Sequence, residues 1–336
     1  MKYLFIAVSI LVLNFSFGGV NPVDAEELTY QNPLGNIKDI GDPFIMKTDS
    51  GYYMYATSAP NYGFKAWHSD NLVVWRDMGL VYDNRRQEHP WGTGDFWAPE
   101  VIEHNGEFYM TFSARTESGS LRIAIAKSES EIGPFIDLNA DLVNEAGSYI
   151  DGHILEDEGT FYFYYVKDVH ENVINSRRLS QILVQEMSEG LDYLVGRPQL
   201  VLTPDQDWEH PLRQEAWNEG PFVLKHDNKY YLMYSANMFA DPDYGVGYAV
   251  SDHPIGPFVK YENNPILQKD LEIGVSGPGH NSVTKGLDDE TLYMVYHIHT
   301  DPNHPSGNRQ MSIDHLYFEN GVLKLDGPTM SEQKLY

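Results

Sequence analysis

A short pattern that recurs five times along this 336-residue chain constrains the fold more than any other feature. Its clearest copy begins at Glu219-Gly-Pro-Phe, where an apolar run (222–224) and an aromatic run (230–234) flank a polar turn. This arrangement predicts a β-hairpin preceded by a carboxylate. The copies lie roughly 60 residues apart, which is typical of repeat architectures. The residues at their heads are Asp42, Ala98, Asp151, Gly220 and His280.

A second unit follows the hairpins. Segments 65–70, 123–128 and 246–252 each read as a short strand that ends in a polar turn. The phrase Ile132-Gly-Pro-Phe returns as Ile255-Gly-Pro-Phe at the same place in its repeat, which indicates internal duplication. We therefore predict an all-β fold, a five-bladed β-propeller with four-stranded blades, as a single domain.

The first residues have the pattern of a secretory signal. Lys2 precedes the apolar run 3–13, and small or β-branched residues precede a cleavage point after Ala25. An uncleaved anchor is the alternative, which the shortness of the run disfavours. We expect residues 1–25 to be a signal peptide, residues 26–336 to be the propeller, and the protein to be secreted or periplasmic.

Composition narrows the possible partners. The formal net charge of −26 argues against nucleic acid or an anionic membrane surface, because both reward positive charge. A neutral polymer, such as a polysaccharide or oligosaccharide, or a cation remains compatible, and dispersed acidic residues also fit a solvated surface. The chain has no cysteine, so disulfides, thiolate metal sites and a lipid-modified amino terminus are excluded. Nothing in the composition indicates an oligomeric state.

Aromatic residues make up 13% of the chain. The paired tyrosines recur at the same place in the repeats, which predicts packing between blades. Trp97 and Trp217 differ, because each lies just before the head of a copy, where the chain enters an inner strand. We expect these two side chains to stack against a sugar ring.

The heads of the repeats carry several charged groups. Inner strands of a propeller surround one axis, so Asp42, Asp151, Glu219 and His280 should converge there, with Glu100 nearby. Burying a charge is costly, and a set of acids at convergent positions indicates a functional pocket rather than separate turn caps. Paired carboxylates without a Cys, Lys or Ser nucleophile motif favour glycoside hydrolysis, in which one acid protonates the departing oxygen and another activates water or attacks.

Five motifs carry a family resemblance over essentially the whole chain after residue 25. In order they are Asp42-Pro-Phe, Trp97-Ala-Pro-Glu-Val, Ile150-Asp-Gly, Glu219-Gly-Pro-Phe and Gly277-Pro-Gly-His-Asn-Ser. Together they closely resemble glycoside hydrolase family 43. The resemblance implies a five-bladed propeller and an inverting mechanism. It also implies that Asp42 is the general base, that Glu219 is the general acid, and that Asp151 orients the acid and modulates its pKa.

The resemblance implies binding residues as well. It suggests that His280 helps hold one metal ion, often Ca²⁺, near the propeller axis, and that Arg309 contacts the sugar. Calcium normally takes oxygen ligands, so a lone imidazole is an unusual primary set. We also expect Phe44 and Glu100, which stand close to the heads of their repeats, to bind substrate. No organic cofactor is expected.

Substrate choice stays open within the resemblance, since such enzymes cleave arabinofuranosides, xylosides, arabinan and some galactans. Glu219-Gly-Pro departs from the Glu-Ala-Pro typical of endo-arabinanases, and no added β-sandwich is evident. We expect an exo-acting α-L-arabinofuranosidase or β-D-xylosidase on plant hemicellulose. The alternatives are an endo-arabinanase or galactan-active relative, a retaining β-fructosidase, and a non-catalytic carbohydrate-binding propeller. For His297 and His299, packing or contact with the pocket rim is favoured over a metal pair.

Overall fold

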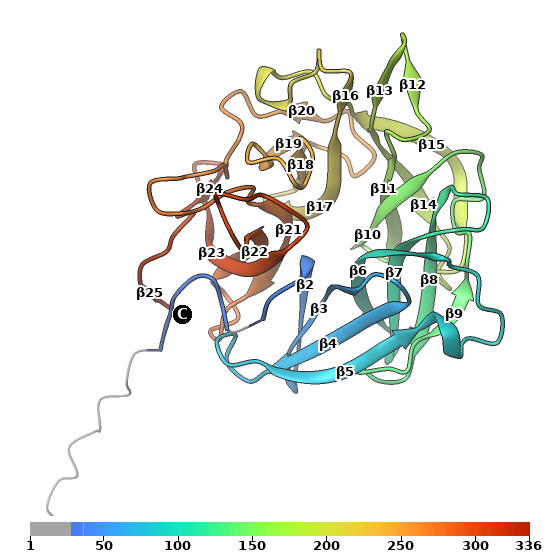
Figure 1. Ribbon diagram of the computed structural model, residues 1–336, viewed down its shortest axis with the longest axis horizontal. Helices are drawn as coiled ribbons and strands as arrows, with labels where there is room; N and C mark the ends of the chain where they lie inside the picture. Colours follow the sequence, from blue (N-terminus) through green and yellow to red (C-terminus); the bar gives the residue numbers. More distant parts are fainter. Residues whose placement is uncertain (1–27, 36) are drawn as a thin grey trace, which may run out of the picture.

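The computed structural model describes residues 28–35 and 37–336, so the predicted signal peptide lies outside the described residues. In this part of the chain, five four-stranded antiparallel sheets surround a common axis (Figure 1). We number these sheets as blades I to V in chain order. The prediction of an all-β propeller is confirmed. Among the same residues, no helix has the length and apolar character needed to cross a bilayer.

Each blade is one contiguous stretch of chain, and its first strand lies nearest the axis (Figure 1). Blade I contains β2 (Gly41–Thr48), β3 (Gly51–Ala59), β4 (Gly63–Ser69) and β5 (Arg76–Asp83). Blade II contains β6 (Gly94–His104), β7 (Glu107–Arg115), β8 (Leu121–Ser128) and β9 (Ile136–Asn139). Blade III contains β10 (Tyr149–Asp157), β11 (Thr160–Lys167), β14 (Gln181–Met187) and β15 (Leu194–Leu202).

The last two blades have the same plan. Blade IV contains β17 (Asn218–His226), β18 (Lys229–Ala236), β19 (Gly245–Ser251) and β20 (Val259–Lys260). Blade V contains β21 (Gly279–Lys285), β22 (Leu292–His299), β23 (Arg309–Glu319) and β24 (Val322–Leu325). The connections carry η1 (Asn84–Arg86), β12 (Val173–Ile174), β13 (Arg177–Leu179), η2 (Asp207–Glu209) and β16 (Glu215–Ala216).

The core fills the spaces between neighbouring blades. Successive residues of a strand point to opposite faces, so the two members of an aromatic pair pack in different directions. Tyr230 joins the apolar cluster shared with blade III, whereas Tyr231 joins the cluster shared with blade V. Tyr52 and Tyr53 divide in the same way between blades V and II. The packing role predicted for these pairs is therefore confirmed.

The ring closes between its first and last blades. Strand β1 (Thr29–Tyr30) pairs antiparallel with β25 (Gln333–Lys334). Two backbone amides near the start of the described chain, those of Leu34 and Ile40, donate hydrogen bonds to carbonyl oxygens of β23. Because every blade supplies all four of its own strands, these contacts and the packing of β2 beside β21 hold blade I against blade V.

An irregularity recurs at the head of each inner strand. The register of the first strand pair shifts there in all five blades, as in a β-bulge. At each shift one residue adopts the left-handed conformation, which is uncommon for residues other than glycine. These residues and their φ angles are Asp42 (54°), Ala98 (48°), Asp151 (57°), Gly220 (55°) and His280 (51°). They are the residues that head the sequence repeats, and we call them the head residues.

Candidate active site

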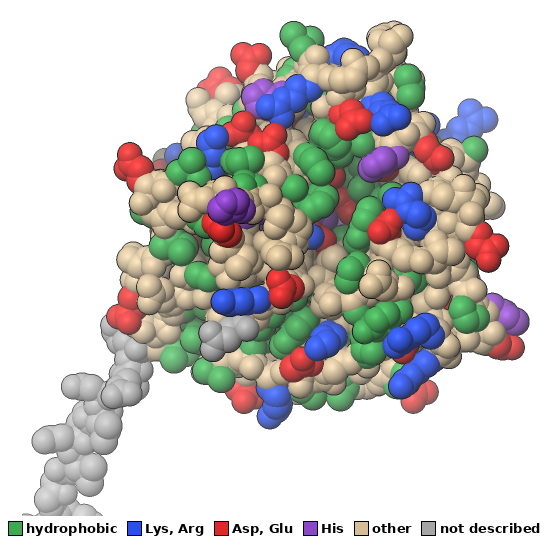
Figure 2. All heavy atoms as spheres, viewed as in Figure 1, with side chains coloured by type: hydrophobic (Ala, Val, Ile, Leu, Met, Phe, Trp, Pro, Cys, Tyr) green, Lys and Arg blue, Asp and Glu red, His purple; other side chains and the backbone are tan. Residues whose placement is uncertain are grey.

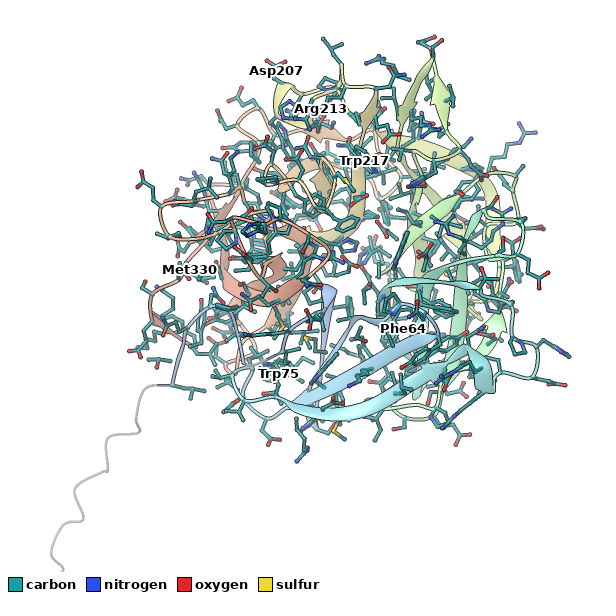
Figure 3. All side chains as sticks on the ribbon, in the orientation of Figure 1. Phe64, Trp75, Asp207, Arg213, Trp217 and Met330 are labelled. Atoms are coloured by element: carbon teal, nitrogen blue, oxygen red, sulfur yellow. The ribbon has the colours of Figure 1, made fainter. Side chains whose placement is uncertain are left out.

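A cavity of about 280 Å³ opens at the end of the axis where the head residues gather. Figure 2 shows acidic and basic side chains at the bottom of a hollow near the centre of this face, and Figure 3 places Trp217 beside it. All five blades or their connections contribute to its lining. The lining residues are Asp42, Trp97, Ile150, Asp151, Asp168, His170, Glu215, Trp217, Glu219, Met238, Phe239, His280 and Arg309.

Two residues expected to bind substrate lie elsewhere. Phe44 and Glu100 line a second cavity, of about 210 Å³, together with His153 and Phe222. Each stands two residues beyond its head residue, which moves it roughly 6 to 7 Å further along the inner strand. Glu100 is also engaged, because its Oε2 lies 2.7 Å from Nδ1 of His153. Neither residue lines the cavity around Asp42, Asp151 and Glu219, and a sugar contact by either one stays a prediction.

The carboxylate of Asp42 is surrounded by a positive charge and hydrogen-bond donors. Its Oδ1 accepts a hydrogen bond from Arg309 Nη1 at 2.8 Å, and its Oδ2 accepts one from the Thr57 hydroxyl at 2.6 Å. Burial alone would raise the pKa of Asp42, but Arg309, His280, His297 and the Thr57 hydroxyl together hold it well below its usual range. This carboxylate is therefore ionised at neutral pH, as a general base must be.

Asp151 and Glu219 have the opposite character. The Gly220 amide donates to Asp151 Oδ2 at 3.0 Å, and the Tyr244 hydroxyl donates to Glu219 Oε1 at 2.8 Å. Burial raises the pKa of both carboxyls. The charge of Asp151 raises the pKa of Glu219 further, whereas the pKa of Asp151 is lowered by His280 and raised by Asp42. The site thus separates an ionised carboxylate from a buried pair that retains a proton, the division that acid–base hydrolysis needs.

Asp168 and Tyr244 were missed in the sequence. Asp168 follows β11, is only 2% exposed and accepts hydrogen bonds at Oδ2 from the backbone amide and the ring of His170. Its charge also raises the pKa of Asp151 and of Glu219. Neither residue lies at the head of a repeat, so the repeat pattern does not indicate them. A polar residue directly after the second strand of a blade would have been the clue.

His297 and His299 lie behind the cavity wall. The Asp42 amide donates to His297 Nδ1 at 3.2 Å. His299 donates from Nε2 to the carbonyl oxygen of Phe239 at 2.8 Å, and the Phe239 ring lies 4.8 Å from the Arg309 guanidinium. Both histidines are buried. These contacts agree with the interpretation as packing and rim support.

The residues around His280, the predicted calcium ligand, are poorly suited to bind calcium. His280 Nδ1 lies 3.4 Å from Asp42 Oδ1, and that oxygen already accepts from Arg309. Within residues 28–35 and 37–336, no group of three or more His, Asp or Glu side chains is placed to hold a metal ion. Calcium usually takes six to eight oxygen ligands, which the residues around His280 do not supply. No step of the chemistry below depends on a metal.

Comparison with known proteins gives one consistent group. The family model described as "Glycosyl hydrolases family 43" matches residues 30–323. A solved structure of a thermostable family-43 glycoside hydrolase is 55% identical, covers 91% of this chain and 99% of its own, and has a TM-score of 0.90. The beta-D-galactofuranosidase xynD of Aspergillus niger is 30% identical over 82% of this chain and 79% of its own. An extracellular exo-alpha-(1->5)-L-arabinofuranosidase of Streptomyces chartreusis is 28% identical, with coverages of 80% and 82%.

Proposed function

This chain belongs to the glycosyl hydrolases of family 43 and hydrolyses O-glycosyl bonds, and we propose that it is an exo-acting α-L-arabinofuranosidase active on plant hemicellulose. The observation that carries this proposal is the cavity, which residues from all five blades line around Asp42, Asp151 and Glu219. Side chains on all sides of the cavity favour a chain end or a single side-chain sugar, whereas an internal cut needs an open groove. The furanosidase names of both relatives described above also support this substrate class.

In the proposed reaction, the carboxyl group of Glu219 gives its proton to the glycosidic oxygen as the bond to the anomeric carbon breaks. Asp42 accepts a proton from a water molecule, and the water oxygen attacks the anomeric carbon from the opposite face. The products are a free sugar of inverted configuration and an alcohol. This mechanism requires roughly 6.5 to 9.5 Å between the two carboxyl groups.

Other residues of the cavity bind and position the sugar. The rings of Trp97 and Trp217 provide apolar faces for the C–H groups of a sugar. Arg309 donates from Nη1 to Asp42 and from Nε to the Gly307 carbonyl oxygen, which leaves the N–H groups of Nη2 for sugar hydroxyls. Asp151 keeps a negative charge near Glu219, so that Glu219 holds its proton to higher pH.

A β-D-xyloside is the second candidate substrate, because it is also a neutral pentoside and brings no sixth carbon into the cavity. We further propose secretion of the protein. The amino-terminal signal pattern supports this, and the Streptomyces chartreusis relative carries the word extracellular in its name.

The experiment is a panel of 4-nitrophenyl glycosides: α-L-arabinofuranoside, β-D-xylopyranoside and β-D-galactofuranoside. We expect the highest kcat/KM on the arabinofuranoside, and NMR of the first product should show the inverted anomer. Polymeric arabinan should release monosaccharide from the start of the reaction. Early release of mixed oligosaccharides would contradict exo action, and a retained anomer would contradict the assigned roles of Asp42 and Glu219.

The calcium ion stays a prediction from the family resemblance. If it binds, the single imidazole of His280 leaves most of its coordination to water, and binding should be weak. Elemental analysis and the melting temperature with and without a chelator test this. A chelator should lower the melting temperature of the parent protein and leave that of His280→Ala unchanged. Equal melting temperatures for the parent with and without chelator, together with no bound metal, would end the prediction.

A further inference from the structure

The five blades allow a residue-by-residue comparison at the head of each inner strand. The residue just before each head residue pairs with a residue near the end of the second strand, and the position is the same in all five blades. These pairs are Gly41 with Thr57, Trp97 with Ser113, Ile150 with Val166, Glu219 with Ser235, and Gly279 with His297. The second-strand positions are therefore structurally equivalent.

In four blades this second-strand side chain accepts a hydrogen bond from the amide of the head residue in the next blade. The bonds are Ala98 N–H to Thr57 Oγ1 (2.8 Å), Asp151 N–H to Ser113 Oγ (3.0 Å), His280 N–H to Ser235 Oγ (2.7 Å) and Asp42 N–H to His297 Nδ1 (3.2 Å). Blade III breaks this rule, because its equivalent residue is Val166, whose side chain has no acceptor atom.

The amide left without that acceptor belongs to Gly220, and it bonds to Asp151 Oδ2 instead. Blade I shows the contrasting arrangement at its own aspartate. There the Thr57 hydroxyl stands between the two groups, since it accepts from the Ala98 amide and donates to Asp42 Oδ2. Asp42 thus contacts the next blade through a hydroxyl, whereas Asp151 contacts it directly.

The direct bond matters because of the peptide unit that supplies it. The Gly220 amide nitrogen is bonded to the carbonyl carbon of Glu219, so the bond ties Asp151 to the backbone that carries the proposed acid. Gly220 is also fixed in place, with a φ of 55° and the His280 ring so close that an added Cβ would lie 3.2 Å from it. A buried amide in this position must find an acceptor.

We propose that Val166 is a positioning residue. Its side chain lacks the hydroxyl found at the equivalent position of the neighbouring blades, so the Gly220 amide donates to Asp151 instead. This hydrogen bond fixes Asp151 beside Glu219. Val166 is fully buried in the apolar cluster between blades III and IV, which also contains Ile150 and Val223. This proposal rests on the proposed function, because it concerns the geometry of the same acid pair.

The test is Val166→Thr, which keeps the shape of valine and adds the missing hydroxyl. The new oxygen can accept from the Gly220 amide and donate to Asp151, as Thr57 does between Ala98 and Asp42. We expect kcat on an unactivated oligosaccharide to fall about tenfold, the effect of displacing one hydrogen bond to a charged group, while KM changes less than twofold. A kcat within twofold of the parent would overturn the proposal.

Two comparisons separate positioning from a loss of packing. Val184→Thr places the same hydroxyl in the same apolar cluster, away from the head residues, and should lower the melting temperature while leaving kcat unchanged. If Val166→Thr does not fold, Val166→Ser and Val166→Ala form a second pair that differs by one hydroxyl. The serine variant should then have the lower kcat, by about tenfold, and equal values would overturn the proposal.

A double-mutant cycle identifies Asp151 as the partner. In an Asp151→Ala background, Val166→Thr should change kcat less than twofold, because the side-chain acceptor that it displaces is gone. A full tenfold loss in that background would overturn the proposal. Failure of the proposed function looks different, since the parent protein itself would then have no activity on the furanoside and xyloside panel.

Discussion

Arg309 Nη1 donates a hydrogen bond to Asp42 Oδ1 across the junction where the last blade meets the first. The proposed general base therefore depends on ring closure, because Asp42 heads β2 whereas Arg309 begins β23. The same guanidinium lies over the Phe239 ring, which links it to the connection that follows β18. The ionised state of Asp42 is thus a property of the assembled ring.

Replacing Arg309 should move the acidic limb of the pH profile. In Arg309→Met the carboxylate loses its adjacent positive charge, so the pKa of Asp42 rises and the acidic limb of kcat/KM moves to higher pH. Arg309→Lys keeps the charge and should shift the limb less. The measurement is kcat/KM from pH 3 to pH 9 on the arabinofuranoside. An acidic limb that stays in place in Arg309→Met would remove Asp42 from the role of base.

Glu219→Gln should distinguish substrates by their leaving groups. The amide cannot protonate the departing oxygen, so we expect a loss of kcat/KM of about 10³-fold or more on alkyl glycosides and oligosaccharides. On 4-nitrophenyl glycosides, whose leaving group needs little protonation, the loss should be much smaller. The comparison is made with one enzyme preparation and both substrate types. Equal losses on the two types would speak against Glu219 as the acid.

Tyr244→Phe should move the basic limb upward. The Tyr244 hydroxyl donates to Glu219 Oε1, and this bond favours the ionised form of the acid. Its removal raises the pKa of Glu219, so the protonated and active form persists to higher pH. Tyr231→Phe is the matched control, because that buried hydroxyl donates to the Gly321 carbonyl oxygen instead. A basic limb that shifts equally in both variants would refute the assignment.

Lys260→Met should destabilise the fold near the start of β17. Lys260 Nζ lies 2.6 Å from Oε1 of Glu209, which is fully buried, and 3.2 Å from Asn218 Oδ1. Removing one partner leaves a buried charge, so we expect the free energy of unfolding to fall by about 3 to 5 kcal/mol in urea. Lys229→Met breaks an exposed pair with Asp252, which solvent screens, so the free energy of unfolding should stay close to that of the parent. Similar losses for the two variants would contradict this.

The sequence predicted the positions of those site residues that stand at equivalent places in the repeats. Asp42, Asp151 and His280 are head residues, and equivalent places in equivalent blades must converge on one axis, so the pattern alone predicted their meeting. Glu219 stands one residue before its head residue, and it reaches the same cavity. Trp97 and Trp217 were placed correctly beside them for the same reason.

The sequence did not predict how far along the propeller axis each side chain lies. Phe44 and Glu100 differ from the correctly placed residues by a step of two along an inner strand, which is enough to move them into another cavity. Asp168 and Tyr244 come from outside the repeat heads, and their approach depends on how connections fold over the blades. Such contacts join residues far apart in sequence and leave no periodic signal.

The pairing of β1 with β25 gives the ring a seam that lies outside the blades. Because each blade is a contiguous segment, the cyclic order of blades does not depend on where the polypeptide starts. A circularly permuted chain, with residues 28 and 336 joined by a short linker and new ends cut into the exposed turn at 144–145, would keep every blade whole. In that chain Asp42 would follow Arg309 across the new linker, so the contact that holds the base would join neighbouring segments of the chain instead of its two ends.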